Sequence, residues 1–251
     1  MEIRGVNSFE KNNSDEIREI KSTQDDAEVF DFEAESYDEQ QAVRKQQFYK
    51  DFSSASTDAE RDLVVANYDY ETKKADLLYD YSFIDNPTDE DMLQFRASLE
   101  YIEESHDVDV FKIEQQARDD QYTLDYAQAK TDSERNLVTQ KYEYESARAA
   151  VVFNYSRIEN PTDEQRTQYE QELKDLDSKN DKAVYNIQKQ ARDEQYTKDL
   201  VNAWQAADRA KITEEYKRDT ARAELVFNFS QLENPTDQQR EEFLAKLDEL
   251  N

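Results

Sequence analysis

Histidine, cysteine and glycine, on which many catalytic motifs depend, are nearly missing from this chain. The chain has one histidine, His106, one glycine, Gly5, and no cysteine. A nucleophilic triad needs a histidine as its base, and a phosphate-binding loop needs several glycines. Carboxylates occur along the whole chain, so no pair stands out as a tuned acid and base. We therefore expect no catalytic residue and no enzyme.

Metal binding is the other chemistry in which His106 could take part. It follows Glu103 at the Glu-x-x-His spacing that di-iron helical proteins use. A two-metal site needs a second such motif, but Asp177 and Asn180 occupy the matching positions 74 residues later. We therefore expect a histidine at a helix junction or on the surface, with no bound metal and no cofactor.

Acidic residues also crowd three short segments around the repeated sequence NPTD. A calcium-binding EF-hand loop needs a glycine at its turn, and these segments contain none. We expect the carboxylates to lie at helix ends, where acids in a first turn stabilise the helix dipole, and we keep weak, nonspecific cation association as the alternative. The acids are Asp85, Asp89, Glu90, Asp91, Glu159, Asp163, Glu164, Glu233 and Asp237.

The net charge argues against two classes of partner. Lysine and arginine number 32 and aspartate and glutamate 60, which gives a formal charge of −28. Such a surface repels the phosphates of nucleic acids and of anionic lipids. The chain also contains no apolar stretch long enough to span a bilayer. We expect neither nucleic-acid binding nor membrane insertion.

Three copies of one sequence unit follow one another along the chain. The sequence NPTD occurs three times, with Pro87, Pro161 and Pro235 separated by 74 residues each time. The same offset aligns other segments without a gap. Each NPTD is followed by three apolar residues at fixed positions. One repeat length upstream, the segment that begins at Ser14 has Lys21, Asp25 and Glu28 at those positions, so it cannot pack in the same way. We therefore place the complete units at 30–103, 104–177 and 178–251. Residues 1–29 are then a leader or linker, which we expect to be partly disordered.

Each unit is expected to contain three helices. Between residues 131 and 158, apolar residues recur at steps of three, four and seven, as in an amphipathic helix. Thr57 and Glu60, and likewise Thr131 and Glu134, have the spacing of a helix-starting capping box. The third unit has Gln205 at that position, so we expect a weaker cap there. Each NPTD marks a second corner, with either its Asn or its Thr as the cap of the next helix.

The boundary between units carries no turn signal. Apolar residues keep one helical face from Phe95 through Ile102 and Val110 to Ala117, without glycine or proline. We therefore predict that a continuous helix joins each unit to the next. The predicted fold is all-α: three tandem three-helix bundles of 74 residues, joined by continuous helices into an elongated rod.

Over residues 30–251 this architecture resembles tandem three-helix repeat proteins, such as spectrin-like rods and the helical repeats of bacterial surface adhesins. The unit is shorter than a spectrin repeat, and the resemblance concerns architecture without a diagnostic motif. It implies a spacer or an array that binds a protein partner.

Some polar residues recur in all three units, which indicates a role within or between units. We expect the three arginines Arg44, Arg118 and Arg192 to lie on aromatic faces or in ion pairs between helices. The alternative is a repeated site for an anion or acidic peptide. The recurring residues are Arg44, Arg118 and Arg192; Asp51, Asp125 and Asp199; and Arg61, Arg135 and Arg209.

Aromatic residues at the striped positions are expected to form the core, and an exposed ladder of tyrosines is the alternative. Trp204 differs from this pattern because Ser56 and Lys130 occupy its position in the other units. A tryptophan that belongs to one unit only is a candidate for contact with a partner.

The sequence thus favours a non-enzymatic structural or adhesive segment of a larger surface protein, with an unidentified protein partner. The alternative is an acidic nucleic-acid mimic or scaffold that binds a basic protein. We expect a monomer, and we favour the cell surface or the extracellular space over the cytoplasm.

Overall fold

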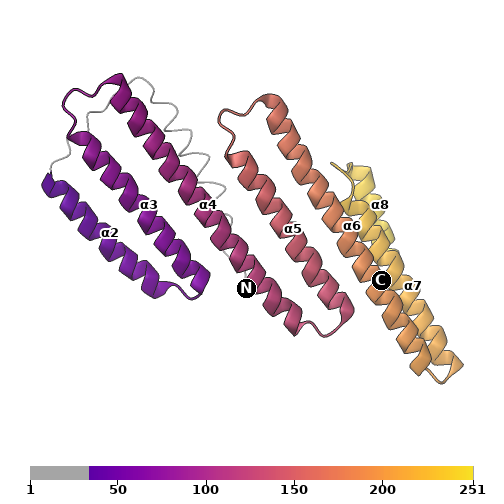
Figure 1. The fold of residues 1–251 in the computed structure, drawn as a ribbon. Coiled ribbons are helices and arrows are strands. Elements are labelled where there is room, and N and C mark those ends of the chain that lie inside the picture. Colours follow the sequence, from indigo (N-terminus) through magenta and orange to yellow (C-terminus); the bar gives the residue numbers. More distant parts are fainter. Residues whose placement is uncertain (1–33, 251) are drawn as a thin grey trace. The chain divides into compact units, whose positions relative to one another are not determined.

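The computed structural model describes residues 34–250, and within this range the chain is helical and contains no strand (Figure 1). The predicted all-α fold is confirmed for that range. Residues 1–29, predicted as a leader or linker, lie outside it. The helices are α2 (Ala34–Ser54), α3 (Asp58–Ser82), α4 (Asp89–Gln128), α5 (Asp132–Ser156), α6 (Asp163–Asn202), α7 (Ala206–Ser230) and α8 (Asp237–Glu249).

Two of the helices are long and cross the boundaries that the sequence placed between repeats. Helices α4 and α6 each have 40 residues, which corresponds to about 60 Å at 1.5 Å per residue. The first part of each is the third helix of one repeat, and the second part is the first helix of the next. The prediction of continuous helices across the repeat boundaries is confirmed.

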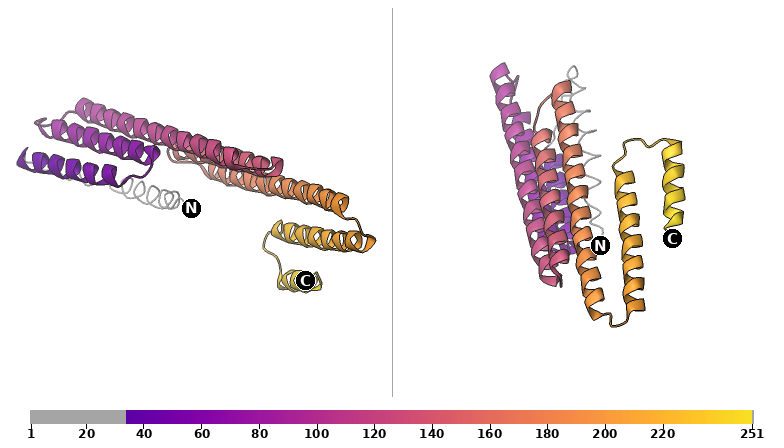
Figure 2. Two further views of the ribbon diagram at one scale, coloured as in Figure 1. Left: turned by 90° about the horizontal axis from the view of Figure 1, so that it is seen from below. Right: turned by 90° about the vertical axis from the view of Figure 1, so that its right-hand side faces the viewer.

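The described residues divide into two units, 34–109 and 110–250, and α4 runs through the division. In the first unit, α3 lies between α2 and the beginning of α4 (Figures 1 and 2). In the second unit, α5 contacts the end of α4 and the beginning of α6, and α7 lies between α6 and α8 (Figure 2). Every repeat thus has its second helix in the middle.

The NPTD corners have one structure in all three repeats. Asn86, Asn160 and Asn234 have backbone φ angles of 54°, 49° and 51°, in the left-handed region that asparagine tolerates better than most residues. The proline follows, and the threonine then caps the next helix: the backbone N–H of Gln165 donates to the Thr162 side chain. The sequence had left either Asn or Thr as the cap, and the cap is Thr.

The corners between first and second helices follow the predicted capping boxes. The Thr131 hydroxyl accepts from the backbone N–H of Glu134, and the Glu134 carboxylate accepts from the backbone N–H of Thr131 at 3.0 Å. The same pair of bonds joins Thr57 and Glu60. In the third repeat Gln205 stands at this position and its side chain makes no capping bond. The weaker cap expected there is confirmed.

Pairs of aromatic rings join each helix to the next, and their positions repeat with the 74-residue offset. Each repeat has two pairs between its first and second helices, which we name the first interface, and one pair between its second and third helices, the second interface. Ring centroids lie 4.0–4.7 Å apart in all nine pairs. The pairs are Tyr37–Tyr79, Phe48–Tyr68 and Tyr81–Phe95; Phe111–Phe153, Tyr122–Tyr142 and Tyr155–Tyr169; and Tyr185–Phe227, Tyr196–Tyr216 and Phe229–Phe243.

Two rings on each middle helix explain why that helix lies between the other two. Phe153 pairs with the preceding helix and Tyr155 with the following one. Residues two apart on a helix point about 200° apart, which is nearly opposite. The same aromatic-x-aromatic spacing occurs at Tyr79 and Tyr81 and at Phe227 and Phe229. The predicted three-helix bundle is therefore an open one, in which the middle helix separates its neighbours.

Burial is shallow throughout the described part of the chain. The hydrophobic residues that are buried there are Ala75, Val110 and Ala203, and each keeps 6–8% of its surface exposed. The paired rings are half-buried, because one face of each ring lies against its partner while the edge of the ring is close to solvent. The ring pairs and the capped corners together therefore carry much of the stability of a repeat.

We predict that restoring a capping box in the third repeat stabilises it. The double substitution Gln205→Thr and Asp208→Glu should raise the free energy of unfolding by about 1 kcal/mol, the usual contribution of such a cap. Thr131→Ala, which removes an existing cap, should lower it by about the same amount. Urea unfolding followed by circular dichroism measures both. No gain from the double substitution, with the expected loss at Thr131, would contradict the role given to this corner.

Candidate protein-binding surface

The first interface contains a tyrosine-aspartate bond in the second and third repeats. The Tyr142 hydroxyl donates to the Asp119 carboxylate at 2.6 Å, and Tyr216 donates to Asp193 at 2.5 Å. These bonds lower the pKa of both carboxyl groups and raise the pKa of both tyrosines. In the first repeat Lys45 occupies the position of the aspartate. The bond is therefore a feature of two repeats and not part of the common fold.

Three recurring arginines, one in each repeat, lie in the first interface. Along the sequence, each stands between the two paired rings of its helix. They are Arg44, Arg118 and Arg192. The Nε atom of each is buried there. The Arg118 guanidinium donates to Gln115 at 3.2 Å, and that of Arg192 lies 5.9 Å from the centre of the Tyr185 ring. These arginines are placed inside the repeat and present little of their charge to a partner.

The other recurring polar residues lie at the corners and on helix surfaces. Arg61 pairs with Asp58 at 2.6 Å, Arg135 with Asp132 at 2.9 Å, and the Arg209 Nε donates to the Ala203 carbonyl at 2.8 Å. Each of the recurring aspartates accepts a 2.7 Å bond from the glutamine four residues earlier on its own helix. These aspartates are Asp51, Asp125 and Asp199.

His106 lies in the second interface of the first repeat. Its ring stacks on that of Tyr70 with centroids 4.3 Å apart, and its Nε2 atom lies 2.9 Å from the Asn67 side-chain oxygen. Glu103, three residues earlier, pairs with Lys74 at 3.6 Å. The histidine and the glutamate thus contact different partners on α3 and do not converge on a common point.

The acidic corners act at helix ends. Asp91 accepts from the Thr88 backbone N–H at 2.9 Å, and Asp163 and Asp237 pair with Arg166 and Arg240 one turn later. Within residues 34–250, no group of three or more His, Cys, Asp and Glu side chains is placed to hold a metal ion. No described helix combines the length and the apolar character needed to cross a membrane.

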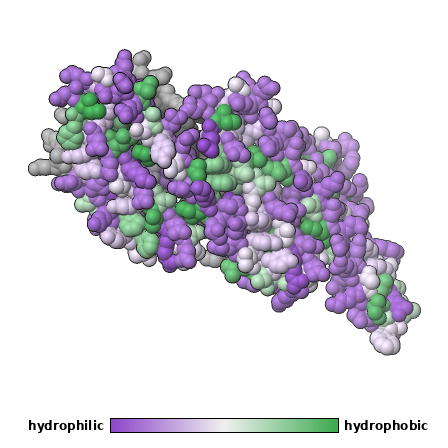
Figure 3. Space-filling model, viewed as in Figure 1, coloured by the Kyte–Doolittle hydropathy of each residue, from purple (hydrophilic) through white to green (hydrophobic). Residues whose placement is uncertain are grey.

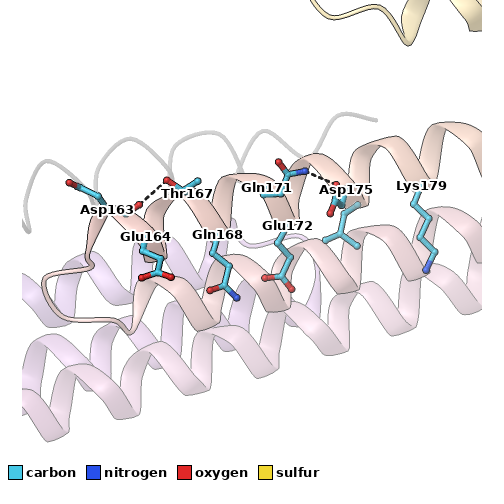
Figure 4. Close-up of a pocket in the computed structure, with 9 residues that line it drawn as sticks. Asp163, Glu164, Thr167, Gln168, Gln171, Glu172, Asp175 and Lys179 are labelled. Carbon is cyan, nitrogen blue, oxygen red and sulfur yellow. Dashed lines mark hydrogen bonds between the residues drawn. The ribbon is translucent and has the colours of Figure 1, made fainter.

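The surface hollows lie on α6. The larger of the two described here follows its first half, and its lining side chains within residues 34–250 come from this one helix (Figure 4). Asp163, Glu164, Glu172 and Asp175 supply four carboxylates, against one lysine, Lys179. This excess of carboxylates gives the surface a negative electrostatic potential, which attracts positively charged groups. A second hollow follows the end of α6 and includes Val201.

Trp204 stands at the corner between α6 and α7. Its side chain is 95% exposed and that of the nearby Val201 is 77% exposed. Ala206 and Ala207, at the start of α7, are also exposed. We name these four residues the Trp204 corner. The sequence singled out Trp204 because it belongs to one repeat, but the three aliphatic neighbours were not considered; comparing the three corners at the 74-residue offset would have identified them.

Other exposed apolar side chains also belong to single repeats. Tyr101, Leu93 and Tyr49 are at least 60% exposed, and polar residues occupy their positions in the other repeats. On the face drawn in Figure 3, hydrophobic residues form separate patches among hydrophilic ones. The ring pairs are thus common to all repeats, while these strongly exposed apolar residues occur in one repeat each.

Comparison of this chain with protein-family models, with curated proteins and with solved structures finds no match.

We predict that Tyr142→Phe makes stability less dependent on pH at both extremes. Because the bond lowers the pKa of Asp119, its contribution is present above the ordinary carboxyl pKa of about 4 and is lost as pH falls through the lower folded value. Because the bond raises the pKa of Tyr142, the contribution is also lost as pH rises above about 10. Thermal unfolding between pH 2 and 11 measures this change.

Tyr68→Phe is the matched control, since Lys45 replaces the aspartate in the first repeat. It should leave the pH dependence as in the parent chain. Lys45→Asp should create the missing bond and raise the unfolding midpoint at pH 7, and it should do so only while Tyr68 is present. Equal effects of Tyr142→Phe and Tyr68→Phe on the pH profile would contradict the assignment.

Proposed function

We propose that this chain is a non-enzymatic repeat segment that serves as a spacer and as a binding array for a protein partner, within a larger surface protein. The observation that carries the proposal is the contrast between interior and surface. The nine ring pairs recur at equivalent positions, while exposed residues such as Trp204 and Tyr101 occur in one repeat each. A constant scaffold with individual surfaces suits an array that presents contacts at fixed intervals.

The continuous helices support the spacer part of the proposal. A repeat boundary inside a 40-residue helix contains no loop, which is the connection that a spacer requires. Tandem repeat proteins of this kind gain stability from contacts between neighbours and present extended surfaces. From the resemblance to surface adhesin repeats we propose an extracellular or cell-surface location, and the spacer hypothesis predicts a monomer.

A second candidate function is the binding of a basic protein by an acidic surface. The net charge of −28 and the excess of carboxylates along the first half of α6 favour it. A basic partner gains from both, because complementary charge speeds association and selects against acidic competitors. A spacer could carry this activity as well, so the two functions are compatible.

We predict that small-angle scattering shows an extended chain. A compact protein of this length has a radius of gyration of about 18 Å, and we expect a value at least about 1.5 times larger. Measurements at two protein concentrations test for self-association at the same time. A radius near that of a compact protein would refute the spacer.

We predict that a 20-residue polylysine peptide binds the chain and that the binding disappears by about 0.5 M salt, where surface charges are screened. A polyglutamate peptide of the same length should not bind. Replacing Glu164, Glu172 and Asp175 together by the neutral amides should weaken the binding more than the same change at Glu143, Glu145 and Asp181. Titration calorimetry measures both variants, and equal losses would show that charge acts without a preferred surface.

A further inference from the structure

The corner between α6 and α7 differs from its two equivalents in a coordinated way. At the other corners Ser56 or Lys130 is followed by a threonine that caps the next helix and by an aspartate. In the third repeat the corresponding sequence is Trp204, Gln205 and Ala206, and the side-chain cap is absent. This corner has thus lost a stabilising bond and an acid, and it has gained exposed apolar side chains.

Contacts within the repeat do not explain the exposed apolar side chains at this corner. The Trp204 side chain is 95% exposed, so it stabilises no contact of its own chain. The two other corners adopt the same turn without a tryptophan, as the backbone bonds from Arg61 to Thr57 and from Arg135 to Thr131 show. Exposed tryptophan with neighbouring aliphatic residues is the composition from which the energetic centres of protein interfaces are built.

The charge of the chain limits what can cover this corner. Glu194 on the adjoining hollow and Asp208 in the first turn of α7 are both exposed, and the whole chain carries −28. A second copy would bring an equal negative charge, which opposes association. A partner with lysine or arginine beside its apolar contact gains from both carboxylates instead.

We propose that the Trp204 corner, Val201, Trp204, Ala206 and Ala207, is a docking site for a basic amphipathic segment of another protein. An apolar side chain of that segment packs on the Trp204 ring, and flanking lysines or arginines pair with Glu194 and Asp208. This site deepens the proposed function and rests on it, because it gives one repeat of the array a specific contact.

The test uses the whole chain and a 14-residue helical peptide of leucine and lysine that contains no tryptophan. Trp204 is the one tryptophan of the chain, so its fluorescence reports this corner alone. The free chain should emit at the wavelength of an exposed indole, and saturation with the peptide should shift the emission to shorter wavelengths. A polylysine peptide should bind without that shift, and a leucine and glutamate peptide should not bind.

The matched variant is Trp204→Lys, which installs the residue that the second repeat carries at position 130 and should leave the fold intact. Calorimetry should show roughly 30-fold weaker binding of the leucine and lysine peptide, the loss typical of an interface centre. Polylysine binding should change little. Ala127→Trp, which places a tryptophan near the corner of the second repeat, should not restore the affinity of the Trp204→Lys chain.

Two results would overturn the proposal. The first is that the peptide binds the Trp204→Lys variant as tightly as the parent chain, or binds the parent chain without an emission shift. The peptide would then bind elsewhere on the acidic surface, and the proposed binding array would not include this corner. If sedimentation shows a dimer of the parent chain that Trp204→Lys abolishes, the occupant is a second copy. The scattering measurement of the spacer is independent of both results, so failure of the proposed function would be recognised separately.

Discussion

Pairs of aromatic rings between consecutive helices, six of them stacked and three tilted, are the interaction on which the rest of this structure depends. The helices carry a large excess of negative charge, so bringing them side by side costs electrostatic free energy that the contacts must offset. A ring pair offsets it efficiently, because two flat faces exclude water over a wide area while the edges of the rings stay near solvent. Tyrosine suits such a position better than phenylalanine where its hydroxyl reaches the rim, as it does when Tyr142 donates to Asp119.

The open arrangement of each repeat follows from where these rings stand on the middle helix. Rings two residues apart, such as Phe153 and Tyr155, face nearly opposite directions, so the two neighbouring helices cannot close on each other. Within residues 34–250, burial is then limited to small or branched side chains such as Ala75 and Val110. Within residues 34–250, no repeat closes around a core of its own, and the boundaries between repeats lie inside continuous helices.

The sequence predicted those features that depend on local chemistry. The 74-residue period, the capping boxes at Thr57 and Thr131 and the absence of turn residues near the repeat boundaries were sufficient for the number of helices and their continuity. It left open whether Asn or Thr caps each NPTD corner, since the answer depends on the backbone angle of the asparagine. It also missed the open packing, because periodicity identifies apolar residues without saying which helix they meet. The candidate surface was found only in part: Trp204 was evident as an exception to the repeat, whereas exposed alanines resemble ordinary helix formers.

One repeat can differ from the others at its corners with the smallest loss of stability. A ring in an interface is constrained by its partner ring on the next helix, so a change there must be matched on the other side. A corner residue has no such partner, and the loss of one cap removes only about 1 kcal/mol from a chain whose repeats support one another. Selection for a contact can therefore act on a corner without disturbing the stacked interior. The third repeat keeps all three ring pairs, has Gln205 in place of the capping threonine, and carries an exposed tryptophan beside it, which is the composition that this reasoning predicts.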